Sequence, residues 1–349
     1  MLASVTHILP LTNIRRTRVL SIPGRVTVRQ GQKVSAVDVI AQANLPARHL
    51  LLDIRRGLGG ITANAAEKAI VRQEGDKLTK GDVIAESGGM FSRIVRAPVD
   101  GEIVTIKAGQ VLLRVQSTGL ELKAGLSGIV AEILPEQGAV IEANGALVQG
   151  VWGNGRIDSG LLLVLAKSPE EELTRVRIDV SMCGAVVLAG YCVTADALHA
   201  AAELPLRGLI LSSLASELTP VASKLDYPIL VLDGFGQIPM NESAYKLLST
   251  SEKRDASVNA TLNPKTGERP EVVIPLPSVG QSTPETDYFT ANKMVRIQGE
   301  PYQGKIGKII QVRQGLATLP NGIRALAADV QLDSDTRVVV PLANLDVLA

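Results

Sequence analysis

The chain has 349 residues, more than one ordinary hydrophobic core accommodates, so several domains are expected. Hydrophobic residues make up 46% and charged residues 20%, which excludes a disordered chain, and the formal charge of +1 excludes a global field that attracts polyanions. Aromatic residues make up only 3%, against 32 glycines and 18 prolines, so we expect aliphatic cores of short strands and little stacking surface for single-stranded nucleic acid.

The cysteines and the N-terminus indicate the compartment. Cys183 and Cys192 are too few for a disulfide framework and belong to no CxxC pair, which favours a reducing environment. The short apolar run at the N-terminus is broken by Pro10 and is followed, not preceded, by arginines, the wrong order for a signal peptide. No stretch reaches the roughly eighteen apolar residues that a membrane span needs. We therefore expect a cytoplasmic protein with no membrane span.

A repeated pattern of short strands fills the N-terminal part. The segment "VRQGQKVSAVDVIA" from Val28 matches "VRQEGDKLTKGDVIA" from Val71 if one residue is inserted in the second copy. Similarly, "APVDGEIVTI" from Ala97 returns as "AGLSGIVAEI" from Ala124. Alternating Val, Ile and Leu between glycine turns indicates strands that face a shared core. Near residues 46–70, the sequence predicts a pair of short helices inserted between the repeats.

The run "GDKLTKGDVIA" followed by "APVDGEIVTI" resembles the barrel-sandwich hybrid of biotinyl and lipoyl carrier domains. The resemblance covers roughly residues 18–150, and we assign residues 1–155 to such repeats. In carrier domains the hairpin between the two halves presents a modifiable lysine shortly before the "AP" pair, and Met90 holds that place here. A swinging arm needs an attachment nitrogen. The resemblance therefore implies a carrier-like fold used as a scaffold, without a cofactor.

Strands and helices alternate from Leu161 onward, and we assign residues 160–275 to an α/β domain. "LLLVLA" and "RVRIDV" read as strands, and "GAVVLAG", "GLILSSL" and "YPILVLDGFG" as further strands. The helices are expected in "ADALHAAAEL", in "ASELTPVASKL", where Pro220 limits the regular part, and from Asn241 to Leu248. The alternation predicts a parallel sheet of a small Rossmann-like or swivelling type.

Ligands of open parallel sheets bind beyond the carboxyl ends of the strands. The best such loop is "DGFGQIPM" at 233–240, because its two glycines let the backbone approach a ligand and a following helix N-terminus favours an anion. The loop is not a full GxGxxG, and a structural turn that feeds a helix is the alternative interpretation. The candidate ligand-binding residues are Asp233, Gly234, Phe235, Gly236 and Ser212.

No combination of residues amounts to a catalytic or metal site. The three histidines, His7, His49 and His199, are scattered over unrelated segments, and neither cysteine joins a group of ligands. GxSxG, HExxH and P-loop motifs are missing. We therefore expect no catalytic residues and no metal, and we favour a protein that is not an enzyme.

Residues 276–292 are polar and are predicted as a linker. After them, "KMVRIQGEPYQGKIGKIIQV" reads as two strands joined by a glycine-rich turn, followed by "ALAADVQL", "RVVVPL" and "ANLDVL". The glycines at 299, 304 and 307 around Pro301 resemble the KOW motif, and residues 293–349 resemble an SH3-like KOW barrel. This resemblance implies a fold of ribosomal and transcription-elongation proteins that often binds RNA or protein.

The hairpin carries a local excess of positive charge. Its candidate nucleic-acid or partner-binding residues are Lys293, Arg296, Tyr302, Lys305, Lys308 and Arg313. The five cations suffice for a few phosphate contacts, and only the tyrosine offers a stacking ring. A barrel that binds protein or is simply packed is the alternative, because a modest charge stripe is usually a solvated face.

Many binding folds without reactive residues favour a non-catalytic scaffold or adaptor that presents surfaces to protein partners or to identical subunits. Two alternatives stay open: RNA binding through the KOW barrel, and binding of a small anionic ligand at residues 233–240.

Overall fold

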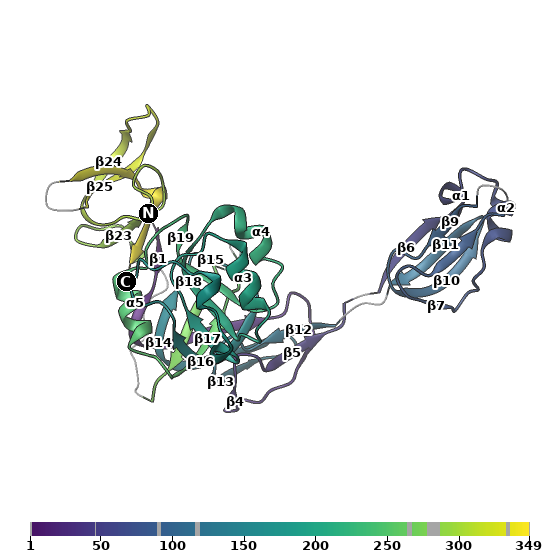
Figure 1. Cartoon of the computed structure of the whole chain (residues 1–349), viewed down its shortest axis with the longest axis horizontal. Coiled ribbons are helices and arrows are strands. Elements are labelled where there is room, and N and C mark those ends of the chain that lie inside the picture. The colour runs from purple at the N-terminus through teal and green to yellow at the C-terminus, as the bar shows by residue number, and fades with distance from the viewer. Residues whose placement is uncertain are drawn as a thin grey trace. The chain divides into compact units, whose positions relative to one another are not determined.

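The computed structural model describes residues 2–45, 47–88, 92–115, 119–263, 267–277, 287–332 and 336–348. The chain is mostly β-sheet, with 48% strand against 13% helix, and it forms several sheets. It divides into a larger unit of residues 1–19, 26–41 and 122–349 and a smaller unit of residues 20–25 and 42–121 (Figure 1). Met90, the place of the carrier lysine, and residues 278–286 of the predicted linker lie outside the described residues. No helix in the described ranges is long and apolar enough to cross a membrane.

The smaller unit contains a four-stranded sheet and a β-hairpin. The sheet has the order β6 (Arg48–Asp53), β11 (Gln110–Val115), β10 (Gly101–Lys107) and β7 (Lys77–Leu78), and the hairpin consists of β8 (Val83–Glu86) and β9 (Ile94–Arg96). Two short helices, α1 (Ile54–Gly57) and α2 (Ala63–Ala69), form where the sequence predicts them, because the side chains of Asp53 and Thr62 cap their N-termini. The unit buries its own aliphatic core, which includes Ile54, Ile84 and Leu113.

The repeats fold as two copies of one arrangement. In the smaller unit, Gly75 N donates to Ile103 O at 2.8 Å, and in the larger unit Gly31 N donates to Val130 O at the same distance. Strand β10 pairs with β7 just as β13 (Gly128–Leu134) pairs with β4 (Lys33–Val34), both antiparallel. The first repeat segment, which contains β4, therefore pairs with the last one, which contains β13, and together they form an outer copy. The second copy, which contains β7 and β10, lies complete between these two segments along the chain, and we call it the inner copy.

The insertion point is the hairpin of the outer copy. Both copies contain "DVIA", in β5 (Val39–Ala43) and in β8, and β5 joins a three-stranded sheet of order β12 (Leu120–Lys123), β5, β3 (Arg25–Val26). Ala97 N donates to Asp82 O at 2.8 Å in the inner copy, and Ala124 N donates to Asp38 O at 2.9 Å in the outer copy. Hence β5 and β12 correspond to β8 and β9. In the inner copy, β8 and β9 are consecutive strands that pair as a hairpin. In the outer copy, the whole inner copy, which we call the inner unit, is inserted between the corresponding strands β5 and β12.

The larger unit is built on one extended sheet. Its order is β15 (Trp152–Gly153), β19 (Ile229–Phe235), β18 (Gly208–Leu214), β17 (Ala185–Leu188), β16 (Ile157–Val164), β20 (Asp255–Asn259), β21 (Glu271–Pro275), β14 (Gly138–Gln149), β13 and β4, with β2 (Ile8–Val19) also paired to β14. Strands β16 to β19 are parallel. The three expected strands of the α/β region therefore lie side by side and share their carboxyl edge.

Helices cover both faces of the parallel strands. Leu209 and Leu211 pack on the face of α3 (Ala195–Ala202) and α4 (Thr219–Ala222), and Ile210 packs on the opposite face with α5 (Glu242–Ser249). Three-residue 3-10 turn η3 (Ser216–Leu218) precedes α4, and Pro220 lies in the first turn of this short helix. Asn241 caps α5, as the sequence suggests.

The prediction of a strand at "RVRIDV" is wrong. These residues form two 3-10 turns, η1 (Arg175–Arg177) and η2 (Val180–Met182). Val176 is 92% and Val180 is 76% exposed, so two of the three alternating apolar residues have no core to face, and Ile178 alone of the three packs against the core. The side chain of Asp179 accepts a hydrogen bond from Ser181 N and favours a turn instead.

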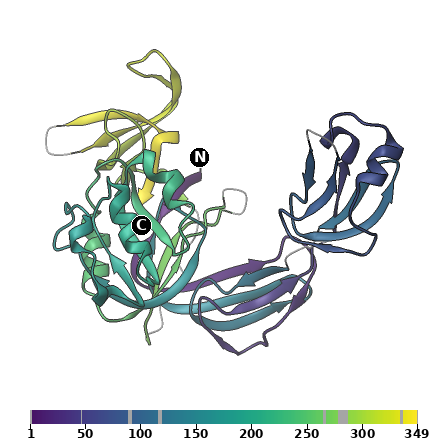
Figure 2. The same cartoon turned by 45° about the vertical axis from the view of Figure 1, so that its right-hand side comes forward.

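A seven-stranded sheet closes the chain. Its order is β22 (Asp287–Tyr288), β1 (Leu2–Thr6), β27 (Leu345–Leu348), β23 (Met294–Ile297), β24 (Ile306–Thr318), β25 (Arg324–Gln331) and β26 (Arg337–Pro341), with the 3-10 turn η4 (Leu342–Asn344) before β27. Strand β1 runs parallel to β27, so the first strand of the chain lies beside the last one (Figure 2). The sheet of C-terminal strands therefore also includes β1, the first strand of the chain.

Candidate functional site

A large cavity lies at the carboxyl end of β19. It has a volume of about 920 Å³ and is lined by the loop 233–240, the start of α5 and the turn between β23 and β24, together with residues of other strands. The sequence suggests two separate sites, one in this loop and one on the basic hairpin. The structure brings parts of both to one cavity, since both Asp233 and Lys305 line it.

Asp233 and Arg296 form a buried ion pair. Arg296 Nη2 lies 2.5 Å from Asp233 Oδ1, and the side chains are only 2% and 3% exposed. Asn241 N donates to Asp233 Oδ2 at 3.0 Å, and Arg296 Nη1 donates to Leu232 O at 3.1 Å. Burial raises the pKa of the Asp233 carboxyl, and the positive charge of Arg296 opposes that shift. The two charges thus neutralise each other in the interior of the protein, and Arg296 does not lie on the surface of the hairpin.

The glycines of the loop pack against the protein itself. A Cβ on Gly304 would lie 3.0 Å from Ile238 Cγ2, and a Cβ on Gly234 would lie 3.3 Å from Ile238 Cδ1. Both glycines have positive φ, of 80° and 135°. The Ile238 side chain therefore packs closely against the backbone at Gly234 and at Gly304, where a larger residue would push it away. Phe235 points elsewhere and meets the ring of Trp152 edge-on, with 6.3 Å between centroids.

A serine next to the expected one positions the loop. Ser213 Oγ lies 2.9 Å from the carbonyl oxygens of Gly236 and Ile238 and accepts a hydrogen bond from Ile238 N at 2.9 Å. The register of β18 shifts between Leu211 and Ser213, so Ser213 faces the loop. Ser212 is fully buried, and its hydroxyl has no hydrogen-bond partner among the described residues. A bulge leaves no signal in this sequence, so the sequence alone does not show which of the two serines contacts the loop.

The basic residues of the hairpin have different surroundings. Lys293 pairs with Asp287, and Arg313 Nη2 pairs with Asp329 Oδ1 at 2.7 Å. Lys305 Nζ lies 5.8 Å from the centre of the Tyr302 ring. Lys305 and Lys308 are exposed and make no ion pair with any residue that the structure describes. Two of the five expected cations are therefore free at the surface.

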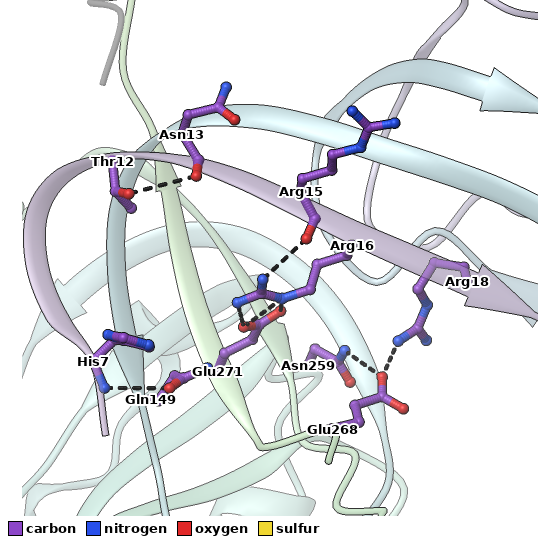
Figure 3. Close-up of polar contacts among 10 residues, drawn as sticks. All are labelled: His7, Thr12, Asn13, Arg15, Arg16, Arg18, Gln149, Asn259, Glu268 and Glu271. Atoms are coloured by element: carbon purple, nitrogen blue, oxygen red, sulfur yellow. Dashed lines mark hydrogen bonds and ion pairs between the residues drawn. The ribbon is translucent and has the colours of Figure 1, made fainter. Parts of the chain in front are cut away.

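A second cavity, of about 510 Å³, has arginines on its wall that sequence reasoning did not single out. Arg16 binds Glu271 through two nitrogens, with Nε 3.0 Å from Oε1 and Nη2 2.7 Å from Oε2 (Figure 3). Arg18 pairs with Glu268, which also accepts from Asn259 Nδ2 at 3.4 Å (Figure 3). Residues two apart on a strand point to the same face, so Arg16 and Arg18 of the run "RRTR" share one face of β2. This spacing is the feature of the sequence that could have indicated the arginine cluster. These arginines join β2 to the segment around β21, so their main role is structural.

No protein-family model and no curated protein matches this chain. Its function is therefore inferred from the arrangement of its residues. Within the described ranges, no group of three or more His, Cys, Asp and Glu is placed to hold a metal ion.

The cysteines and histidines have separate surroundings, and only His7 among them lines one of the two cavities described above. Cys192 is buried, and burial raises the pKa of its thiol to about 11. Cys183 is exposed. His49 lies on β6 and His199 on α3, while His7 lines the arginine cavity, where its backbone N donates to Gln149 Oε1 at 3.2 Å (Figure 3).

Proposed function

We propose that this chain is a non-catalytic scaffold or adaptor that displays its inner unit to partner proteins or identical subunits. The nested duplication carries the proposal. The outer copy holds a complete second unit at the place where the inner copy has only the hairpin between β8 and β9. On the barrel-sandwich interpretation of both copies, that hairpin is where a carrier domain presents its functional group. A protein module here takes the place of a prosthetic group.

The larger unit is suited to serve as a rigid platform. The Asp233–Arg296 pair joins the parallel sheet to β23, and Arg269 forms a second joint. Arg269 Nη1 donates to Thr6 Oγ1 at 2.7 Å, and its Nη2 lies 3.4 Å from Asp346 Oδ1. In this proposal the parallel-sheet region is a Rossmann-like or swivelling α/β domain, the C-terminal strands form a KOW-type SH3-like barrel, and the protein works in the cytoplasm.

Removal of the insertion tests the scaffold. The ends of the inserted segment are close, since a Cβ on Gly119 would lie 3.7 Å from Ala43 O. Residues 44–119 can therefore be replaced by an Asn-Gly turn. We expect this shortened chain and the isolated inner unit to unfold cooperatively as separate proteins. We also expect partners captured by the full chain to follow the inner unit, or self-association measured by analytical ultracentrifugation to disappear with it.

A matched control carries an unrelated small domain in place of residues 44–119, which preserves an insertion but removes this one. The proposal fails if this control keeps the partners or the oligomeric state of the full chain. It also fails if the full chain shows an enzymatic turnover that the Asp233→Asn substitution abolishes.

RNA binding by the C-terminal strands is a second candidate function. Lys305 and Tyr302 lie in the turn between β23 and β24, and Lys308 lies on β24. Both lysines are exposed and make no ion pair with the described residues. Two free cations support about two phosphate contacts, fewer than the sequence suggests. Arg296 is excluded from such contacts by its burial.

A further inference from the structure

Among the described residues, the lining of the cavity at the end of β19 combines apolar side chains with one cation that makes no ion pair. The apolar side chains include Met294, Leu332 and Leu348, and the cation is Lys305. Met294 is 45% exposed although it is a large apolar side chain on a strand. The volume of about 920 Å³ lies in the range of roughly 300–1,000 Å³ that is typical of small-molecule sites.

Two of the other polar side chains that line the cavity, those of Asp233 and Asn241, are engaged within the protein. Arg296 neutralises Asp233, and the Asn241 side chain accepts hydrogen bonds from Ser243 N and Ala244 N. The start of α5 is therefore capped by the protein itself, which leaves Lys305 as the cation without an ion pair among the described residues that line the cavity. Glu242 is an exposed carboxylate in the first turn of α5. A ligand must accordingly offer an anion to Lys305 and an apolar body to the methionine and the leucines.

We propose that this cavity binds a small anionic amphiphile, with an aliphatic body and a carboxylate or phosphate head. The head contacts the Lys305 ammonium, and the body covers Met294, Leu332 and Leu348. Burial of these apolar side chains supplies most of the affinity, because the hydrophobic effect scales with the apolar area removed from water. The ammonium of Lys305 favours an anionic head group over a neutral or cationic one. Because such an exposed ion pair contributes only modestly to the binding free energy, its role is selectivity and not affinity. This ligand role is separate from the scaffold role, which does not depend on it.

Titration of the full chain with matched probes tests the proposal. The probes are decanoate and decyl phosphate, with decanol as the neutral body, decylamine as the cationic body, and acetate and inorganic phosphate as heads alone, all below their micelle concentrations. We expect saturable binding of the first two by isothermal titration calorimetry, with a raised melting temperature. Decanol should bind about tenfold more weakly, the ratio that about 1.4 kcal/mol produces. The heads alone should not bind.

Three variants locate the binding. Lys305→Gln should weaken decanoate about tenfold and leave decanol unchanged. Lys308→Gln should change neither, because Lys308 lies on β24, three residues after Lys305, and does not line the cavity. Met294→Trp should abolish binding of all probes by filling the cavity, and circular dichroism checks its fold. Met294→Glu, a change that a partly exposed position tolerates, should abolish binding of decanoate and decyl phosphate, because its carboxylate repels their anionic heads.

Several outcomes overturn the proposal. They are no saturable binding of either anionic probe, an equal effect of Lys305→Gln and Lys308→Gln, tightest binding of decylamine, or unchanged binding in both folded Met294 variants. Flotation with phosphatidylglycerol vesicles separates a free amphiphile from a bilayer. We expect no flotation, and flotation that Lys305→Gln abolishes would overturn the proposal in favour of a membrane surface.

Discussion

The guanidinium of Arg296 and the carboxylate of Asp233 meet at 2.5 Å in a nearly dry environment, although they belong to different sheets of the larger unit. Asp233 lies on the last parallel strand, β19, and Arg296 lies on β23. The pair joins the two sheets, and Asp233 also lines the cavity at the carboxyl end of β19. Two residues that the sequence assigns to separate binding sites are thus partners of each other.

Breaking this pair should destabilise the larger unit strongly. Asp233→Leu leaves the Arg296 charge buried without its partner, and such a loss costs about 3–5 kcal/mol in the free energy of unfolding. The double variant Asp233→Leu/Arg296→Met should recover most of that loss, because no buried charge remains. Urea unfolding followed by circular dichroism measures both.

The exposed pair of Arg15 and Glu132 provides the control for this prediction. Its side chains are 57% and 54% exposed, so Arg15→Ala should cost at most about 1 kcal/mol. An Asp233→Leu variant no less stable than Arg15→Ala would contradict the structural importance of the buried pair.

Asp329 should make the C-terminal strands sensitive to acid. Burial alone would raise the pKa of Asp329, but hydrogen bonds from Arg313, Gln311 and Arg337 lower it below its ordinary value of 3.8. The stabilisation is therefore present above about pH 4 and is lost as the pH falls through the lower pKa of the folded state. Asp329→Asn should cost about 2 kcal/mol at pH 7, and its difference from the native chain should shrink in acid. Thermal unfolding between pH 2 and 7 checks this, and a constant difference would contradict it.

The two cysteines should react very differently. Cys183 is exposed, whereas Cys192 is buried with its pKa raised to about 11 and its Sγ donating to Thr194 O at 3.4 Å. At pH 8 the folded protein should therefore react at one thiol with iodoacetamide, and in guanidinium chloride at both. Peptide mass spectrometry identifies the site. Rapid labelling of Cys192 in the folded chain would show that its surroundings open readily.

If the C-terminal hairpin binds RNA, Lys305 and Lys308 should account for its dependence on salt. Each charge reversal, Lys305→Glu or Lys308→Glu, should weaken binding and reduce the slope of log K against log salt by about 0.7, the value for one phosphate contact to a single strand. Lys246→Glu, an exposed lysine on α5, is the control. Binding that ignores both substitutions and the salt concentration would exclude this function.

Local features of the sequence correctly indicate many elements of the fold. Asn241 marks the start of α5 because its side chain can satisfy free N–H groups of the first turn, and Gly31 and Gly75 mark equivalent turns because both adopt positive φ. The apolar runs of β17, β18 and β19 are buried on both faces, as continuous hydrophobic strands in parallel sheets are. Where the same alternation has no core to face, at Val176 and Val180, the prediction of a strand fails.

The sequence by itself determined the repeats, most of the alternation of strands and helices and the approximate starts of several helices, since these depend on residues close together along the chain. Only the tertiary structure decided that the outer repeat encloses the inner one, that β1 joins β27, and that Asp233 binds Arg296. The physical reason is that strand pairing and ion pairing are satisfied by any complementary partner that folding brings near. Periodicity specifies which face of a strand is buried, but it does not specify what lies against that face.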